Sequence, residues 1–548
     1  MYFRPAILAL LTAFLCVSGT GCRKSDAPAP AAPPTVLSPD TIASVHWVGK
    51  RRLDLDADAY YLSRVWSLPE TERLQSQTFD RLATGVWRVL LGDAAAARIP
   101  PIVLRPLLDD LAFNESYLEI RATTNSTSSF QPSTFNSQPS FAFAIRLNTL
   151  HAGIWETNGA IAMQLLTGSP IVADHATHGW SLQRTNATVS LTRVGDWTVL
   201  SVGPSPNPLA DDLAARIRRD GLPFVSADTN NLWFEATLAP SRLADCFSLS
   251  AGGEGRGVVD HSSLATRHSS LSQLRLTLSG DGGNVITRGS LTFAEPFASG
   301  LPPWHLPGGL VHEPLLGFTA VRGGQSALTA SPLWNRLQLG APDQFYLWSL
   351  TGSPSQFYLA APLPDAVHQM PALADRLLQN ANPWLAANGY ISFDRAADTN
   401  GVVWGSLPDI QPFIKFAGTA DDGWLYAGLF PDAGAGAGQS APDGMFQDIL
   451  HRPNLVYYDW ELTGARLPSC LYLGQTARQI FHQAQLPVPS ASAAWLTMLQ
   501  PRLRTSATIL TRTAPDQLTF LRKSTLGLTA PELQLLAGWL ESPRFPAW

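Results

Sequence analysis

The chain has 548 residues, of which 45% are hydrophobic, enough for roughly two to four domains with buried cores. Charged residues make up 15%, below the usual ~25%, and 38 Lys and Arg against 43 Asp and Glu give a net charge of −5. A chain with this balance lacks the positive field that attracts nucleic acids, and we therefore predict no nucleic-acid partner.

The N-terminus has the pattern of a secretory signal peptide. Arg4 precedes an apolar run from Ala6 to Val17, whose 12 residues are too few for a membrane-spanning helix of ~20 residues. Small residues from Ser18 to Gly21 then lead directly to Cys22. We predict that residues 1–21 are a signal peptide.

The segment that ends at Cys22 resembles the lipobox of bacterial lipoproteins, although that family prefers Leu at the position of Gly19. The resemblance implies that Cys22 carries the lipid, including palmitate, and anchors the body outside the cytoplasm, in the bacterial cell envelope. Residues 22–39 are rich in Pro and Ala and favour an extended tether. Ordinary cleavage after Gly19 or Gly21 is the alternative, and it gives a secreted or periplasmic soluble protein.

Three amphipathic helices are marked by a proline in their first turn, at Pro69, Pro208 and Pro531. Ser67–Glu70 and Thr529–Glu532 have the spacing of capping boxes. Four pairs of strands joined by short loops predict β-hairpins. The paired strands are 189–194 with 197–202, 274–278 with 291–293, 344–350 with 356–360, and 505–513 with 518–522.

Hairpins with helices in clumps indicate an α+β fold, in which helices cover one face of each antiparallel sheet. The Gly/Ser-rich segment 248–270 divides the body into two similar halves, an N-terminal domain at 40–247 and a C-terminal domain at 271–548. A weak repeat agrees with this division. Strand 197–202 is followed by the helix at 209–213, and strand 356–360 is likewise followed by the helix at 373–377.

Few residues suggest chemistry. Asp174, His175 and His178 include residue types that bind Zn²⁺, but they lie in a predicted loop, and we predict neither a metal nor another cofactor. The sequence contains no G-x-S-x-G motif, P-loop or C-x-x-C motif, so no catalytic residue is predicted.

Two further features, the remaining cysteines and one aromatic segment, each allow two interpretations. Cys246 and Cys470 are left after the N-terminal cysteines are assigned, and they either form a disulfide or remain buried thiols. In the segment 455–462, alternation places Tyr457, Asp459 and Glu461 on one strand face. That face either is half-buried or forms a surface for binding a sugar or peptide.

These features favour a non-catalytic envelope lipoprotein that binds a protein, glycan or lipid partner, or supports envelope assembly. The first alternative is an extracytoplasmic hydrolase whose catalytic residues meet only in the folded chain. The second alternative is a carrier of an apolar ligand, suggested by the 17 Trp and the many Leu residues.

Overall fold

The computed structural model divides into two compact units. The first comprises the described residues of Met1–Glu295, Pro489–Met498 and Leu535–Trp548, and the second those of Pro296–Val488 and Leu499–Gln534. The described residues are 34–92, 100–122, 139–174, 178–184, 187–228, 231–243, 271–297, 300–330, 334–335, 340–351, 356–387, 392–396, 401–404, 411–419, 422–429, 443–480 and 490–546.

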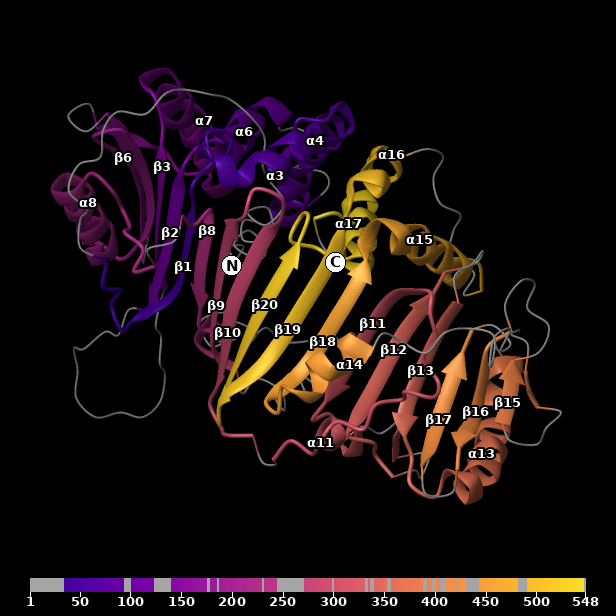
Figure 1. Ribbon diagram of the computed structural model, residues 1–548. Helices are drawn as coiled ribbons and strands as arrows, with labels where there is room; N and C mark the ends of the chain where they lie inside the picture. The colour runs from indigo at the N-terminus through magenta and orange to yellow at the C-terminus, as the bar shows by residue number, and fades with distance from the viewer. Residues whose placement is uncertain are drawn as a thin grey trace, which may run out of the picture. The chain divides into compact units, whose positions relative to one another are not determined.

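The first unit contains an antiparallel sheet with ten described strands (Figure 1). Neighbouring strands follow the order β4-β5-β6-β7-β3-β2-β1-β8-β9-β10. The strand bounds are β1 (Thr41–Trp47), β2 (Ser116–Ala122), β3 (Pro139–Arg146), β4 (Val172–Asp174), β5 (Gly179–Arg184), β6 (Ala187–Val194), β7 (Trp197–Gly203), β8 (Phe234–Leu238), β9 (Leu271–Gly280) and β10 (Val285–Phe293).

Helices cover both faces of this sheet. Leu118 of β2 packs with α6 and α7, whereas its neighbour Tyr117 points to the opposite face and packs with α8. The prediction that helices cover only one face is therefore wrong for this unit, because both alternating sets of side chains are apolar. The helical elements are α2 (Lys50–Leu53), η1 (Ala57–Ala59), α3 (Tyr60–Trp66), α4 (Pro69–Leu91), η2 (Pro101–Val103), α6 (Arg105–Phe113), α7 (Thr149–Thr167), α8 (Pro208–Asp220) and α16 (Ala491–Leu499).

The second unit also contains ten described antiparallel strands, in the order β14-β15-β16-β17-β13-β12-β11-β18-β19-β20. The strands are β11 (Leu315–Arg322), β12 (Gln344–Leu350), β13 (Gln356–Pro362), β14 (Phe393–Arg395), β15 (Gly401–Trp404), β16 (Phe413–Gly418), β17 (Gly423–Gly428), β18 (Leu455–Leu462), β19 (Thr505–Ala514) and β20 (Gln517–Ser524). The helical elements are α11 (Gln325–Thr329), α13 (Ala366–Ala387), α14 (Asp443–Leu450), α15 (Thr463–Ile480), η3 (Gln500–Arg502) and the start of α17 (Ala530–Glu541), whose residues from Leu535 onward belong to the first unit.

The two sheets share one topology, since β1 to β10 and β11 to β20 occupy the same places in the two strand orders. The register agrees as well. In the first unit Tyr117 lies opposite Ala144, which lies opposite Val199. The matching positions of the second unit, all buried like the first three, are Tyr346, Ala360 and Tyr426. A buried Trp also occupies the matching register position in β7 and β17, at Trp197 and Trp424.

The local predictions agree with this fold. All four hairpins are present as β6–β7, β9–β10, β12–β13 and β19–β20, and helices begin at or beside the three marked prolines. Thr529 and Glu532 form one capping contact, from the Thr529 backbone N–H to the carboxylate. The predicted capping box at Ser67 is wrong, because the Ser67 hydroxyl donates to the backbone carbonyl of Ser63 at the end of α3 and does not cap α4.

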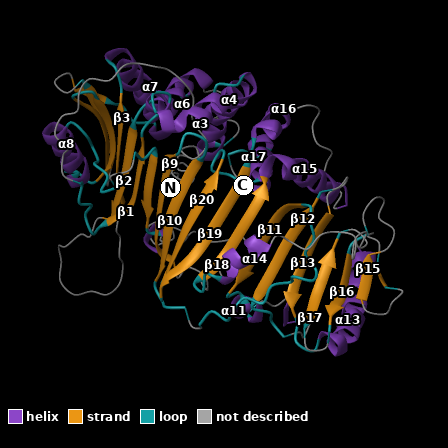
Figure 2. Cartoon of the chain, in the orientation of Figure 1, coloured by secondary structure: helices purple, strands orange, loops and turns teal. Residues whose placement is uncertain are grey.

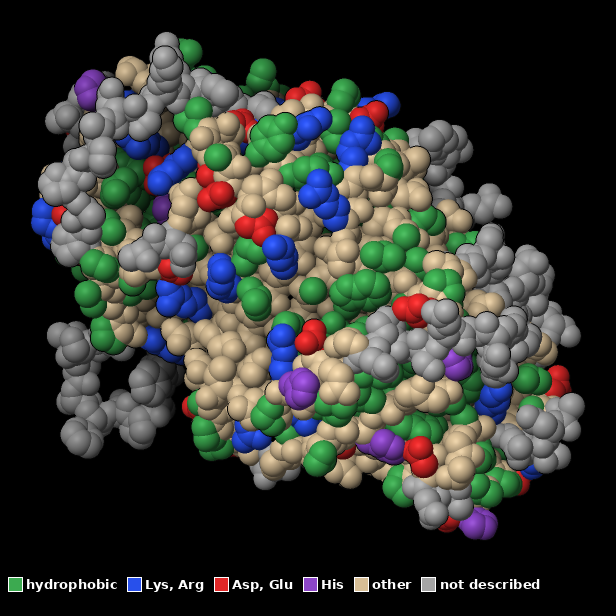
Figure 3. Space-filling model, in the orientation of Figure 1, with side chains coloured by type: hydrophobic (Ala, Val, Ile, Leu, Met, Phe, Trp, Pro, Cys, Tyr) green, Lys and Arg blue, Asp and Glu red, His purple; other side chains and the backbone are tan. Residues whose placement is uncertain are grey.

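The order of strands and helices is thus α+β with antiparallel pairing (Figure 2). Segment 248–270 lies outside the described residues, so the predicted linker stays a prediction; β9 pairs with β8 and belongs to the first unit. Among the described helices, none combines the length and hydropathy needed to cross a bilayer. On the face shown in Figure 3, described basic and acidic side chains are interspersed.

Candidate functional site

The first unit carries a helical insertion in the connection between β1 and β2. This connection runs over residues 48–115, whereas the equivalent connection between β11 and β12 needs only residues 323–343. The insertion turns away from the sheet at Gly49, where φ is +80° and an added Cβ would lie 2.5 Å from the carbonyl carbon of Asn114. Only glycine fits this close approach, so the start and the end of the insertion are held together.

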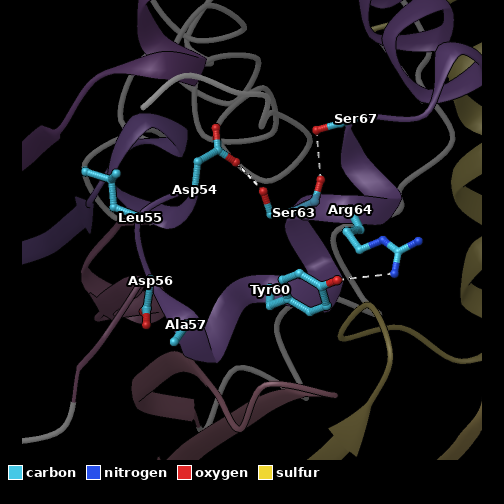
Figure 4. Close-up of a pocket in the computed structure, with 8 residues that line it drawn as sticks. All are labelled: Asp54, Leu55, Asp56, Ala57, Tyr60, Ser63, Arg64 and Ser67. Carbon is cyan, nitrogen blue, oxygen red and sulfur yellow. Dashed lines mark hydrogen bonds between the residues drawn. The ribbon is translucent and has the colours of Figure 1, made fainter. Parts of the chain in front are cut away.

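A buried ion pair fixes the first turn of the insertion. Lys50 is fully buried, and its Nζ lies 3.0 and 3.1 Å from the two carboxylate oxygens of Asp54. The hydroxyl of Ser63, from α3, also donates to Asp54 (Figure 4). Nζ further lies 5.8 Å from the centroid of the Trp66 ring. Asp54 is therefore neutralised by the protein itself and ties α2 to α3.

Two adjoining grooves lie on either side of the ridge formed by residues 55–57. The Tyr60 groove, of about 420 Å³, is bordered by that ridge and by Tyr60, Ser63, Arg64 and Ser67 of α3 and its end. The Trp233 groove, of about 320 Å³, lies between the same ridge and residues that include Asn231 and Trp233. Both volumes fall within or near the ~300–1,000 Å³ common for small-molecule sites.

Asp56 holds the ridge in place. One of its carboxylate oxygens accepts from the backbone N–H of Asp58 at 3.0 Å, which caps η1. The other oxygen accepts from Nδ2 of Asn231 at 2.6 Å and from Nε1 of Trp233 at 2.7 Å. These bonds connect the insertion to the residues just before β8. The carboxylates of Asp54 and Asp56 are therefore both hydrogen-bonded within the protein.

The Tyr60 groove exposes a different set of side chains. Tyr60 is 59% exposed and Leu55 is 51% exposed, both large apolar surfaces at the rim. Arg64, also exposed, donates from Nη1 to the Tyr60 hydroxyl at 3.3 Å, and its guanidinium carbon lies 5.7 Å from the ring centroid. The groove therefore offers an aromatic face, an aliphatic side chain and a cation.

A second constellation joins α6 to α7. Asp110 is 3% exposed, and one oxygen lies 2.7 Å from Nδ1 of His151. Its carboxylate also accepts from Nε1 of Trp155 at 3.0 Å and from Nδ2 of Asn114 at 3.2 Å. Burial raises the pKa of Asp110, against the opposing effect of His151. The carboxylate orients an imidazole that is one-third exposed.

Tyr457, Asp459 and Glu461 lie on β18 with the shared face that alternation predicts, but the two acids do not form a binding surface. Asp459 is 5% exposed and Glu461 is fully buried. Arg466 of α15 lies 2.9 Å from Glu461, whose other oxygen accepts from the backbone N–H of Ala530 at 2.7 Å. Burial raises the pKa of both carboxyls, although Arg466 opposes the rise.

The other predicted site residues are divided between described and undescribed parts of the chain. Asp174 and His178 are exposed near the turn between β4 and β5. Cys22, His175 and Cys246 lie outside the described residues, so the lipid anchor, the metal candidate and the disulfide stay predictions. Within the described residues, no three His, Cys, Asp or Glu side chains gather as a metal site would require.

Cys470 lies in α15 and is buried as a free thiol. Its exposed fraction is 6%, and burial raises the pKa of the thiol to about 11. The thiolate that exchange or alkylation requires is therefore strongly disfavoured in the folded second unit.

The groove was not predicted from the sequence, although one local feature marks it. Residues 54–61 alternate three aspartates with small or aliphatic residues and end in two tyrosines, and Asp54 lies four residues after one of only four lysines. No local sequence pattern indicates Asn231 and Trp233, because only the pairing of β1 with β8 brings them close to the insertion. Comparison of the chain with protein-family models, curated proteins and solved structures finds no match.

Proposed function

We propose that the protein is a non-catalytic lipoprotein of the bacterial cell envelope, anchored through Cys22, whose body binds an envelope ligand in the Tyr60 groove. The signal-peptide pattern, the lipobox resemblance and the Pro/Ala-rich tether support the anchor. The groove supports the binding role, because it places exposed aromatic and cationic groups above a rigid, internally satisfied floor.

The position of the groove in the fold carries this proposal. Two similar-sized halves share ten strand positions, and we regard them as copies of one ancestral domain. The groove lies in the insertion at residues 48–115, which the second copy does not share. An element added to one copy of a repeated framework is more readily explained by a specific role than by the needs of the framework.

The chemistry of the groove favours binding over catalysis. Two serines, Ser63 and Ser67, line the groove. The Ser63 hydroxyl donates to Asp54, a carboxylate already paired with Lys50, and the Ser67 hydroxyl donates to the backbone carbonyl of Ser63. Neither contact supplies a base that is free to take the hydroxyl proton, so neither serine is activated as a nucleophile. The same interactions keep the groove in one shape before the ligand arrives.

A blocked groove tests the binding role. Ala57 lies on the exposed ridge, and Ala57→Trp fills space shared by both grooves. The matched control is Ala494→Trp, at an exposed position of α16. Binding to purified polysaccharides, peptides and phospholipid vesicles is measured for the soluble body. We expect Ala57→Trp alone to abolish the binding; the proposal fails if no compound binds or if the blocked variant binds normally.

The anchor is tested separately. Cys22→Ser should move the protein from the membrane fraction to the soluble fraction of its host, and radiolabelled palmitate should label the wild type alone. A wild type that takes up no label would contradict lipidation and favour the secreted or periplasmic alternative.

The hydrolase alternative retains one observation in its favour, the oriented imidazole of His151 beside buried Asp110. Such an imidazole can accept a proton from water as the water attacks a carbonyl carbon. Hydrolysis of p-nitrophenyl acetate that is lost in His151→Ala, and retained in the exposed variant Leu150→Ala, would support this function. Equal rates in the variants and in a protein-free blank would remove it.

A further inference from the structure

The hydrogen-bonding capacity of the Tyr60 groove is unevenly distributed. Its two carboxylates accept bonds from the protein: Asp54 from Lys50 and Ser63, and Asp56 from Asn231, Trp233 and a backbone N–H. A ligand that offers only donors therefore meets acceptors that are already engaged. A simple cationic ligand, which paired aspartates at first suggest, would therefore compete with bonds that these carboxylates already make.

The donors of the groove, in contrast, face the open space. Arg64 has five N–H groups, and its hydrogen bond to the Tyr60 hydroxyl uses one of them. Since that hydroxyl accepts from Arg64, its own hydrogen can be donated to a ligand. No carboxylate lies within 4.0 Å of the Arg64 guanidinium among the described residues. Arg64 thus has N–H groups left to donate to a ligand carboxylate.

We propose that the Tyr60 groove binds an acidic carbohydrate, with a sugar carboxylate on Arg64 and the apolar face of the sugar ring on Tyr60. This assignment rests on the proposed binding function and names its ligand class. A guanidinium pairs with a carboxylate through two parallel hydrogen bonds. The 59% exposed ring of Tyr60 and the neighbouring Leu55 supply a flat apolar surface beside that cation.

An acidic peptide fits this groove less well than a sugar. A peptide that binds in extended form gains much of its affinity from hydrogen bonds to an open strand edge. The groove wall is helical instead, and its backbone N–H groups are used internally, as in the bonds from Asp54 to Lys50, Leu55 to Arg52 and Ser67 to Ser63. A sugar needs no such edge, because its hydroxyls and carboxylate bond to side chains.

Titration calorimetry with hexagalacturonate tests the proposal on the soluble body. The matched ligand is fully methyl-esterified hexagalacturonate, which keeps the rings and removes the charge. We expect the acid to bind and the ester to bind at least about tenfold more weakly, a change that corresponds to ~1.4 kcal/mol. A hexaglutamate peptide serves as the probe for the other class of ligand.

Three variants identify the residues. Arg64→Gln and Tyr60→Ala should each weaken binding of the acid at least about tenfold, because each removes one half of the site. Tyr60→Phe should retain most of the affinity, since the ring remains. Arg73→Gln changes another exposed arginine, on α4, and should bind like the wild type. All these positions are at the surface, and unchanged circular dichroism confirms that the variants are folded.

These experiments distinguish failure of the acidic-sugar assignment from failure of the proposed binding function. Equal binding of acid and ester, or equal binding by wild type and Arg64→Gln, overturns the acidic-sugar assignment but not the binding function if Ala57→Trp still abolishes binding. Preference for hexaglutamate also overturns the assignment, in favour of a peptide. If hexagalacturonate does not bind, the acidic-sugar assignment is refuted. The proposed binding function fails as well only if none of the polysaccharides, peptides and vesicles binds.

Discussion

Replacement of Arg216 by methionine should destabilise the first unit by about 3 kcal/mol at pH 7. Arg216 is 5% exposed on α8, with Nη2 2.6 Å from the carboxylate of Glu119, which is itself fully buried on β2. Its Nη1 donates to the carbonyl of Pro223 at 2.9 Å. Methionine keeps the aliphatic stem of the side chain but leaves both acceptors without this donor.

The magnitude follows from what remains around Glu119. Removal of one partner of a buried ion pair costs ~3–5 kcal/mol. We expect the lower end, because Arg121 stays 2.7 Å from the same carboxylate and the hydroxyl of Tyr117 still donates to it at 2.8 Å. In the double variant Glu119→Gln/Arg216→Met the orphaned charge is also gone, so most of the loss should be recovered.

The effect should depend on pH with a defined sign. Burial acts to raise the pKa of Glu119, but Arg216 and Arg121 outweigh it and hold this pKa below its ordinary value. In the wild type the pair therefore contributes stability above pH ~4.5, which is lost as the pH falls through the lowered pKa. Without Arg216 the burial effect is less opposed and the pKa rises, so the difference between variant and wild type should shrink at pH 4.

Urea unfolding at pH 7, 5 and 4, with amide hydrogen exchange read in peptides from β2 and α8, measures this difference for the first unit. A loss below about 1 kcal/mol at pH 7 would show that Arg216 is not holding a buried charge. A loss that stays constant from pH 7 to pH 4 would refute the electrostatic explanation and leave packing as the cause.

Three further predictions concern packing and reactivity. Gly49→Ala should lower the melting temperature far more than Gly92→Ala, because both have φ near +80° but only at Gly49 does a Cβ collide with backbone; equal shifts would contradict the close approach. Leu213→Ala, at a fully buried site of α8, should cost ~2–5 kcal/mol in urea unfolding; a cost below 1 kcal/mol would mean that α8 does not pack on the sheet. Iodoacetamide should label Cys470 slowly in the native protein and rapidly in urea, as read by mass spectrometry, because the thiol is buried and its pKa is raised; rapid native labelling would disprove its burial.

The hairpins were predictable because each is a local structure. A two-residue loop such as Gly195–Asp196 between alternating strands leaves only an antiparallel partner. The strand order was not predictable, since β3 pairs with β7 and β1 pairs with β8 across long connections. Nothing in the local pattern of β1 records that its neighbours are β2 and β8, because any strand with two apolar faces fits the middle of a sheet.

The repeat was anticipated with the wrong partners. The sequence aligned β7 and α8 with β13 and α13, because each pair is a strand followed by a helix. The strand orders instead match β13 and α13 with β3 and α7, and β7 and α8 with β17 and α14. A strand followed by a helix occurs more than once in each unit, so short similarity could not choose between the copies.

The sequence did not predict the Tyr60 groove for a related reason, because periodicity describes local structure and not tertiary contacts. Tyr457, Asp459 and Glu461 were correctly placed on one strand face, but periodicity does not say whether a mixed face is covered. Here it is covered by α15 and by the first residue of α17, whose N–H meets Glu461. The groove residues, in contrast, lie on short helices with little periodicity, and the role that we propose for them depends on which hydrogen bonds are already satisfied.

The two units show how sheets of the same topology accommodate different connections. The Tyr117 and Tyr346 positions, and the Trp197 and Trp424 positions, are buried in both, so the sheet itself is maintained by packing. The connections differ more in length, as between β1 and β2 and between β11 and β12. A connection that leaves and returns at neighbouring strands, as at Gly49, can lengthen without disturbing the ladder between those strands. The β1–β2 insertion therefore adds the Tyr60 groove, for which we propose a binding role, to the first unit at little cost to the fold.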